Sequence, residues 1–442
     1  MEKQQHPEFD FIEASNGIHE YRLKSNDLQV LLLTENSAPV TTFMVTYRVG
    51  SRNEPGGLTG ATHFLEHLMF KGSLRFNRDN RKTVFNVLQR LGAQVNATTW
   101  FDRTNYYESI PREHLSLASE IEADRMRGAL LREEDVASEK TVILNELDRG
   151  ENEPIRKLFH SVWSTAFVAH PYHHPTIGWR SDVEHTTAEA LRGFYDTYYW
   201  PNNAAISVIG DFDPRDALSL IARHFGSIEP SPNPVPEIHT VEPPQRGERR
   251  VVVRQEGQLG SVVLAFKQPP GRSDDAVALQ VLSVLLSLGK SSRLYRRLVD
   301  PGSATHVFAS ASFLRDPGLF YVFAMLSPDV EAEQVEDEIW SVLTSVATDG
   351  VTEAELTRAR NQLRAQQVFG RDGSFAIASQ LNEAIAAGDW KLYATALERA
   401  NAVTADDVRR ATATYCVKDQ MTVGYYLPVP AAHQTNGSAP ED

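Results

Sequence analysis

The 442-residue chain has almost no cysteine, no long apolar run and no excess of positive charge, and each absence excludes a class of protein. Cys416 is the only cysteine, which rules out an internal disulfide framework, and we expect it to be a small buried apolar residue. No stretch approaches the roughly eighteen apolar residues of a membrane-spanning helix, so no membrane contact is expected. The net charge of −14 would repel nucleic-acid phosphates, which excludes nucleic acid as the expected partner.

The acidic balance has a second consequence for ligands. A negative cavity would favour basic peptides, although an acidic surface most often serves only solubility. Residues 1–8 contain no apolar core of a secretory signal, and with the single cysteine this predicts a cytoplasmic protein. The alternative is a periplasmic protein from which a signal peptide has been removed.

Proline is concentrated in one part of the chain. The composition, with 23% charged and 41% hydrophobic residues, is that of a globular protein, and the length requires two or more domains. An extended, semi-rigid linker is predicted where proline accumulates and apolar periodicity is lost. The prolines concerned are Pro230, Pro232, Pro234, Pro236, Pro243 and Pro244.

The pattern of expected elements occurs twice. The first half opens with expected strands at 20–33 and 39–49 and then enters a helix. The second half opens with expected strands at 249–254 and 261–267, followed by a helix at 274–288. An internal duplication is the simplest explanation.

The sequence therefore predicts an α+β fold of two duplicated domains, each a mostly antiparallel sheet packed with helices. The predicted boundaries are 1–225 for an N-terminal catalytic domain, 226–248 for the Pro-rich linker and 249–428 for a homologous C-terminal domain. Residues 429–442 are low in hydrophobicity and are predicted to form a disordered tail.

The most informative motif is the pentapeptide from His63 to His67. On a helix, His63 and His67 lie one turn apart on the same face, where two imidazoles can bind one Zn²⁺. Glu66 shares that face and can reach a water molecule at the metal. The order is the reverse of the common His-Glu-x-x-His zinc-protease helix and is typical of inverzincins.

The surroundings of this motif distinguish a metal site from a surface helix with two solvated histidines and a glutamate. A turn-rich segment precedes the motif, and Thr59 is the expected N-cap of the helix. The flanking apolar residues predict that the helix is largely buried, where its polar groups need partners such as a metal. These flanking residues are Phe64, Leu65, Leu68, Met69 and Phe70.

A catalytic zinc site usually has three protein ligands, so a third is expected elsewhere. Residues 133–146 have a helical pattern in which Glu139 and Glu146 lie two turns apart on one face. Val142 and Ile143 lie between them, so that face is partly apolar. Either glutamate alone would be assigned to a solvated face. Together they predict one metal ligand and one carboxylate that supports a ligand.

Residues 50–54 and 60–72, with the two glutamates seven residues apart, resemble the pitrilysin (insulinase) family of zinc metallopeptidases. Among its members the chain is most similar to bacterial two-domain peptidases and the mitochondrial processing peptidase catalytic subunit. The resemblance implies zinc ligands at His63, His67 and Glu146, a general base at Glu66, and an orienting carboxylate at Glu139.

The resemblance spans roughly residues 18–428 and includes a strand at 91–99. In this family the strand is an edge strand, and it implies that Asn96, Ala97 and Thr98 bind the substrate backbone. Family members also enclose a chamber between their domains, which implies a preference for short or unfolded peptides. The second half has no ligand set corresponding to the motif, so one zinc ion per chain is expected.

The second half departs from the family pattern at two positions. Members that act alone carry an arginine and a tyrosine there that hold the substrate near zinc, and these positions fall on Val299 and His306. Arg293 and Tyr295 match a different, structural part of the pattern. The departure implies that this chain is the zinc-bearing subunit of a heterodimer with a homologous subunit that lacks zinc.

The predicted function is that of a zinc-dependent metalloendopeptidase acting on short or unfolded peptides through a water activated by Glu66 and the metal. One alternative is a non-catalytic structural subunit of the same fold, and another is a peptide-binding module with structural zinc. The ligands and the adjacent glutamate favour the peptidase. Four further histidines are expected to be loop or satisfied polar residues, namely His170, His173, His174 and His185.

Overall fold

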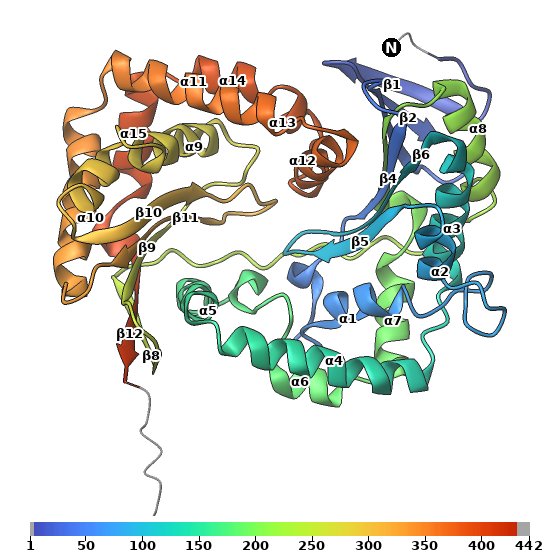
Figure 1. Ribbon diagram of the computed structural model, residues 1–442, viewed down its shortest axis with the longest axis horizontal. Helices are drawn as coiled ribbons and strands as arrows, with labels where there is room; N and C mark the ends of the chain where they lie inside the picture. The colour runs from blue at the N-terminus through green and yellow to red at the C-terminus, as the bar shows by residue number, and fades with distance from the viewer. Residues whose placement is uncertain (1–3, 431–442) are drawn as a thin grey trace, which may run out of the picture.

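The computed structural model describes residues 4–430 of the chain. Two β-sheets, each mixed but mostly antiparallel and packed with helices, lie in the two halves of the molecule (Figure 1). This architecture confirms the predicted α+β fold with two similar units. Within the described residues, no helix is both long enough and apolar enough to cross a lipid bilayer.

The first sheet has seven strands in the order β1-β2-β3-β7-β4-β6-β5. Only the β3–β7 pair is parallel, and β5 pairs with β6 alone, so β5 is an edge strand. The strands are β1 (Phe9–Ser15), β2 (Ile18–Leu23), β3 (Gln29–Thr34), β4 (Val40–Tyr47), β5 (Gln94–Thr99), β6 (Thr104–Pro111) and β7 (Ala204–Gly210). The helices of this half are α1 (Ala61–Leu68), α2 (Val84–Gln89), α3 (Leu115–Gly128), α4 (Glu133–Glu151), α5 (Pro154–Ala166), α6 (Arg180–His185), α7 (Ala188–Tyr198) and α8 (Pro214–Phe225).

The second sheet has five strands in the order β10-β11-β9-β12-β8, with β12 and β8 parallel. Its strands are β8 (Arg249–Glu256), β9 (Ser261–Lys267), β10 (Ala304–Ala311), β11 (Leu319–Leu326) and β12 (Met421–Val429). The helices are α9 (Asp274–Ser287), α10 (Ala332–Asp349), α11 (Glu353–Phe369), α12 (Ser374–Ala386), α13 (Lys391–Ala394), α14 (Ala396–Ala402) and α15 (Ala405–Tyr415).

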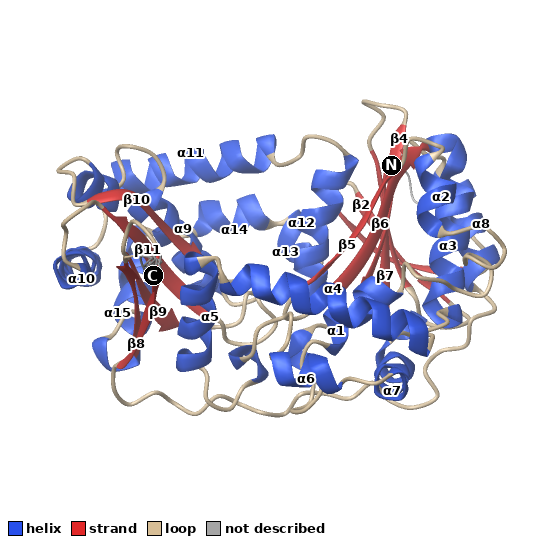
Figure 2. Ribbon diagram, turned by 60° about the horizontal axis from the view of Figure 1, so that its bottom comes forward, coloured by secondary structure: helices blue, strands red, loops and turns tan. Residues whose placement is uncertain are grey.

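The two halves exchange helices. Helix α5 belongs to the first half in sequence, yet Leu158 and Val162 pack against Val263 and Tyr426 of the second sheet. In return, Ile377 of α12 packs in one apolar cluster with residues of the first sheet. Figure 2 shows α5 and α12 between the two sheets. Each half is therefore covered in part by a helix from the other.

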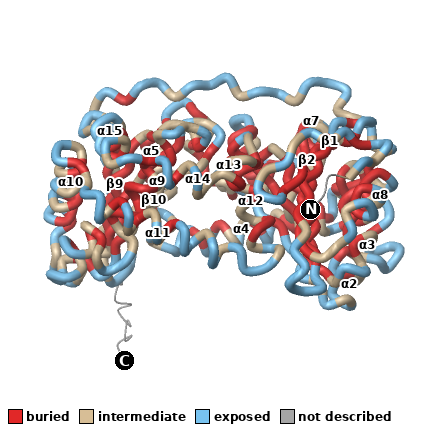
Figure 3. The backbone as a smooth tube through the Cα atoms, turned by 90° about the horizontal axis from the view of Figure 1, so that it is seen from above, coloured by how far each residue is buried: buried red, intermediate tan, exposed pale blue. Residues whose placement is uncertain are grey.

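Residues 226–248 contain no helix or strand and connect β8 to the first half. Figure 3 shows this segment as a largely exposed trace along the outside of the molecule. Of the predicted tail, residue 429 ends β12 and residues 431–442 lie outside the described part of the chain.

One expected strand is wrong in detail. Residues 20–33 form a hairpin of β2 and β3 instead of one strand, because the chain turns between Leu23 and Leu28. Asp27 has a φ of 59°, a left-handed conformation that an extended strand excludes and that aspartate tolerates in a turn.

Candidate metal centre

Three predicted ligands from two helices meet in space. His63 and His67 on α1 and Glu146 on α4 offer ligand atoms that all lie within 4.8 Å of one another. Glu146 Oε2 is 3.6 Å from Nε2 of His63 and 3.8 Å from Nε2 of His67. Tetrahedral zinc with bonds of 2.0–2.1 Å holds its ligand atoms about 3.3 Å apart. The three side chains therefore fit a zinc ion after small adjustments.

A fourth side chain orients one of these histidines. Nδ1 of His67 lies 3.1 Å from Oε2 of the buried Glu139, and the Lys71 ammonium pairs with the other oxygen of Glu139. An imidazole that donates its Nδ1 proton to this carboxylate presents the Nε2 lone pair toward the other ligands. Glu139 thus lies where a support for a metal ligand is needed, and Lys71 is a partner that sequence reasoning missed.

The His63 imidazole is nearly buried, and its Nδ1 has no hydrogen-bond partner among the described residues. Burial lowers the pKa of His63 to about 3, with smaller contributions from His67 and from the positive charge of Arg156. The ring is therefore neutral over the physiological range, which is the form that binds a metal through nitrogen.

The beginning of α1 is fixed by a residue other than the predicted one. Thr59 does not cap the helix, because its hydroxyl donates to Asp182 and accepts from the Trp179 amide. Instead, the buried Glu54 accepts hydrogen bonds of 2.8 Å from the amides of Gly60 and Thr62. The Glu54 side chain thus satisfies two amides of the first turn that have no partner within the helix, and burial raises its pKa to about 8.

Glu66 faces the end of the edge strand. The hydroxyl of Thr99, the last residue of β5, donates a 2.5 Å hydrogen bond to Oε2 of Glu66. Burial raises the pKa of Glu66, and this hydrogen bond opposes the shift. Sequence reasoning gave Thr99 no role, although it lies at the end of the same strand motif.

The predicted substrate-binding residues Asn96, Ala97 and Thr98 lie on β5. Asn96 and Thr98 are exposed, whereas Ala97 is buried, as expected for alternating side chains on an edge strand. The Thr98 hydroxyl donates to Asn105, and Arg103 donates to both the hydroxyl and the carbonyl of Thr98. The free edge of β5 is a place where an extended peptide can add as a further strand.

The four histidines that were predicted to be loop or satisfied polar residues lie in loops or at helix ends. His170 is buried, and its Nε2 lies 3.1 Å from Oδ2 of Asp316 in the second half. His174 is buried, and its Nδ1 lies 3.7 Å from Glu54. Burial lowers the pKa of His174 to about 4. His173 and His185 bond to backbone carbonyls.

The departures from the family pattern lie in the second half. Val299 is partly buried against the second core, and His306 is exposed on β10. Arg293 bonds to Glu355 through Nε at 2.8 Å and Nη2 at 2.9 Å, and it donates to the carbonyl of Gly350. Arg293 therefore ties α11 to the segment before β10.

Comparisons with known proteins place this geometry in a family. Residues 29–179 match the family model described as insulinase (peptidase family M16), and residues 185–363 match the one described as the peptidase M16 inactive domain. The zinc protease PqqE of Helicobacter pylori is 34% identical over 365 residues, which cover 81% of this chain and 82% of that protein.

Two further relatives extend over more of the chain. A crystal structure of a protease from Helicobacter pylori superposes with a TM-score of 0.86 at 30% identity, covering 96% of this chain and all of that one. The probable mitochondrial-processing peptidase subunit beta of Arabidopsis thaliana is 25% identical over 91% of this chain and 77% of its own length. The chain belongs to the insulinase family of zinc peptidases, peptidase family M16.

Proposed function

We propose that this chain is a zinc-dependent endopeptidase whose active site consists of His63, His67, Glu146 and Glu66. The observation that carries the proposal is the convergence of three ligand side chains beside a glutamate that faces the edge strand. Three protein ligands leave one position for substrate or water, as in catalytic zinc sites, whereas structural zinc sites usually have four protein ligands.

The residues of the chain divide the chemistry between them. A zinc ion bound by the three ligands would lower the pKa of a water molecule and polarise the scissile carbonyl. The carboxylate of Glu66 would take a proton from the attacking water and return it to the leaving amine nitrogen. Glu139 would hold His67 in the tautomer that presents Nε2.

The substrate would lie extended along β5 and bond through its backbone to the segment Asn96–Ala97–Thr98. This mode of binding needs an unfolded or short peptide, because a folded protein rarely offers a free extended segment. Its contacts are mainly to the backbone, so the strand itself contributes little sequence preference.

The chain would work with a homologous subunit that lacks zinc. Val299 cannot supply the positive charge that family members with a complete site carry, and His306 lacks the reach and phenol of a tyrosine. The similarity to a relative named as a processing peptidase subunit beta supports an assembly of two different chains.

The test is hydrolysis of a quenched fluorescent peptide by the purified chain, with bound zinc counted by metal analysis and Glu66→Gln as the control. About one zinc per chain and activity that disappears in Glu66→Gln would support the peptidase. If wild type and Glu66→Gln cleave equally, the proposed site is wrong. Full activity of the chain without a partner would contradict only the heterodimer proposal and would leave the peptidase proposal intact.

A non-catalytic structural subunit is the second candidate. It is favoured by the match of residues 185–363 to a domain described as inactive. The intact ligands His63, His67 and Glu146 oppose it, because a subunit without catalysis has no need of a complete metal site. This alternative would be supported if the chain binds zinc but hydrolyses no peptide, both when it is alone and when its partner is present.

A further inference from the structure

An aromatic cavity of about 590 Å³ lies between α5 and the second sheet. Its walls come from both halves of the molecule, and the ring of Phe159 on α5 lies 5.1 Å from that of Tyr321 on β11. The residues directly after β5 also reach it. The Phe, Trp and Tyr residues that line it are Trp100, Phe101, Phe159, Trp163, Phe308, Phe313 and Tyr321.

Arg156 contributes a positive charge to the wall of this cavity and forms no ion pair with a described carboxylate. Among residues 4–430, no carboxylate lies within ion-pair distance of its guanidinium. The guanidinium is packed against α4, because a Cβ placed on Gly150 would be only 3.0 Å from its Cζ. A half-buried arginine normally has an anionic partner, so this one is available to a ligand.

The remaining charges around the cavity leave this positive charge uncompensated. Glu383 is the carboxylate in the wall, and it is bound by Arg103 through Nε at 3.1 Å and Nη2 at 2.5 Å. His160 lies one turn beyond Arg156 on α5, and burial lowers its pKa to about 4, so it is neutral. The cavity is thus basic in a protein whose net charge is −14.

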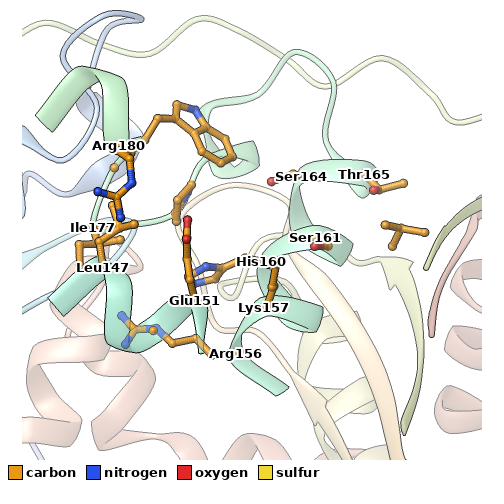
Figure 4. A pocket seen from close by; sticks show the side chains of 15 residues that line it. Leu147, Glu151, Arg156, Lys157, His160, Ser161, Ser164, Thr165, Ile177 and Arg180 are labelled. Atoms are coloured by element: carbon orange, nitrogen blue, oxygen red, sulfur yellow. The ribbon is translucent and has the colours of Figure 1, made fainter. Parts of the chain in front are cut away.

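An adjoining cavity of about 390 Å³ shares Arg156 and His160, so both side chains line both cavities. Figure 4 shows them there beside Lys157, with Glu151 of α4 opposite His160. Glu151 is exposed and forms no ion pair with Arg156. Of the two cavities, the aromatic one is next to β5, because Trp100, the residue directly after that strand, lines it.

The cavity adjoins the metal centre. Thr99 bonds to Glu66 beside the ligands, and the next residue, Trp100, lines the cavity, while α5 follows the ligand helix α4 after a two-residue break. A peptide lying along β5 would therefore place a residue close to the scissile bond at this cavity. Its backbone would stay on the strand while one side chain enters the aromatic walls.

We propose that Arg156, with His160 beside it, makes this cavity select peptides that carry a carboxylate in a residue next to the scissile bond. The inference rests on the proposed peptidase function and names its substrate class. The guanidinium would donate two hydrogen bonds to the carboxylate, and the rings would enclose its methylene stem. The carboxylate has two sources, an acidic side chain or the C-terminus of a short peptide.

Binding to the zinc-loaded Glu66→Gln full-length chain tests this without turnover. Fluorescent peptides that differ only in Glu or Gln at each position flanking the cleavage point would be compared, each with a free or an amidated C-terminus. We expect one Glu position to increase affinity by about tenfold, the effect of a charge-assisted hydrogen-bonded pair. A preference only for the free C-terminus would assign the cavity to the terminal carboxylate.

Arg156→Gln in the same background should remove the difference between the Glu and Gln peptides and leave binding of the Gln peptide unchanged. Arg149→Gln is the matched control, because Arg149 is exposed on α4 and lines neither cavity. Equal affinity for all peptides, or a Glu preference that survives in Arg156→Gln, would overturn the inference. Failure of the peptidase proposal would appear separately, as unchanged hydrolysis in Glu66→Gln.

Discussion

Oε2 of Glu139 on α4 lies 3.1 Å from Nδ1 of His67 on α1, so an acidic side chain of one helix orients an imidazole of the other. Replacing Glu139 with Ala should weaken zinc binding by roughly 10- to 100-fold, because the imidazole loses the partner that fixes its tautomer. Competition with a fluorescent chelator measures this affinity. Glu133→Gln, at an exposed position of the same helix, should leave it unchanged.

Thr99→Val removes the hydroxyl that bonds to Glu66 and keeps the shape of the side chain. We expect kcat to fall about tenfold, since a hydrogen bond to a charged group contributes on the order of 1.5–3 kcal/mol. Zinc content should stay the same. Thr99→Ser keeps the hydroxyl and should retain most activity. A Thr99→Ser variant as slow as Thr99→Val would show that the methyl group matters instead.

Glu54→Ala should destabilise the protein by about 1–3 kcal/mol, because the amides of Gly60 and Thr62 lose their buried acceptor. Urea unfolding measures the loss. The removal of this cap at the first turn of α1 should also weaken zinc binding. A stable Glu54→Ala protein would mean that water replaces the carboxylate.

The Arg293–Glu355 pair predicts a pH dependence of stability. Hydrogen bonds from Arg293 lower the pKa of Glu355 from 4.5 to about 2, so the folded state favours the ionised form. The stabilisation is complete above pH 4.5 and is lost as the pH falls toward 2. Because Glu355 is partly exposed, we expect only about 1–2 kcal/mol.

Glu355→Gln should therefore have a lower free energy of unfolding than wild type at pH 7. The difference between the two proteins should shrink as the pH falls from 4.5 toward 2. Urea unfolding at several pH values measures the difference. Glu353→Gln, in the same turn but exposed, should show no such trend. A constant difference down to pH 2.5 would exclude titration of Glu355 as its cause.

Local patterns predicted much of this structure. The expected strand at 261–267 and helix at 274–288 agree with β9 and α9 to within one residue, because their apolar periodicity is strong. Helical spacing placed His63 and His67 on one face, and the family resemblance implied that Glu146 joins them, as the three side chains do in the structure.

Contacts between distant residues were not predictable in this way. Thr59 has the chemistry of an N-cap, but Asp182 and Trp179 occupy its hydroxyl, so Glu54 takes that place. The Thr99–Glu66 bond likewise depends on how β5 lies over α1, which no local pattern encodes. The roles of Asn96, Ala97 and Thr98 in substrate binding stay predictions.

The exchanged helices have a consequence for biosynthesis. The ribosome releases β3, β4 and β7 well before α12, whose Ile377 and Leu381 cover the apolar surface around Leu31 and Met44. The apolar surface of the nascent first half therefore stays exposed until the second half emerges from the ribosome. We therefore expect the isolated metal-binding half to be unstable, and we expect that cutting the exposed segment 226–248 in the folded protein leaves two fragments that stay associated.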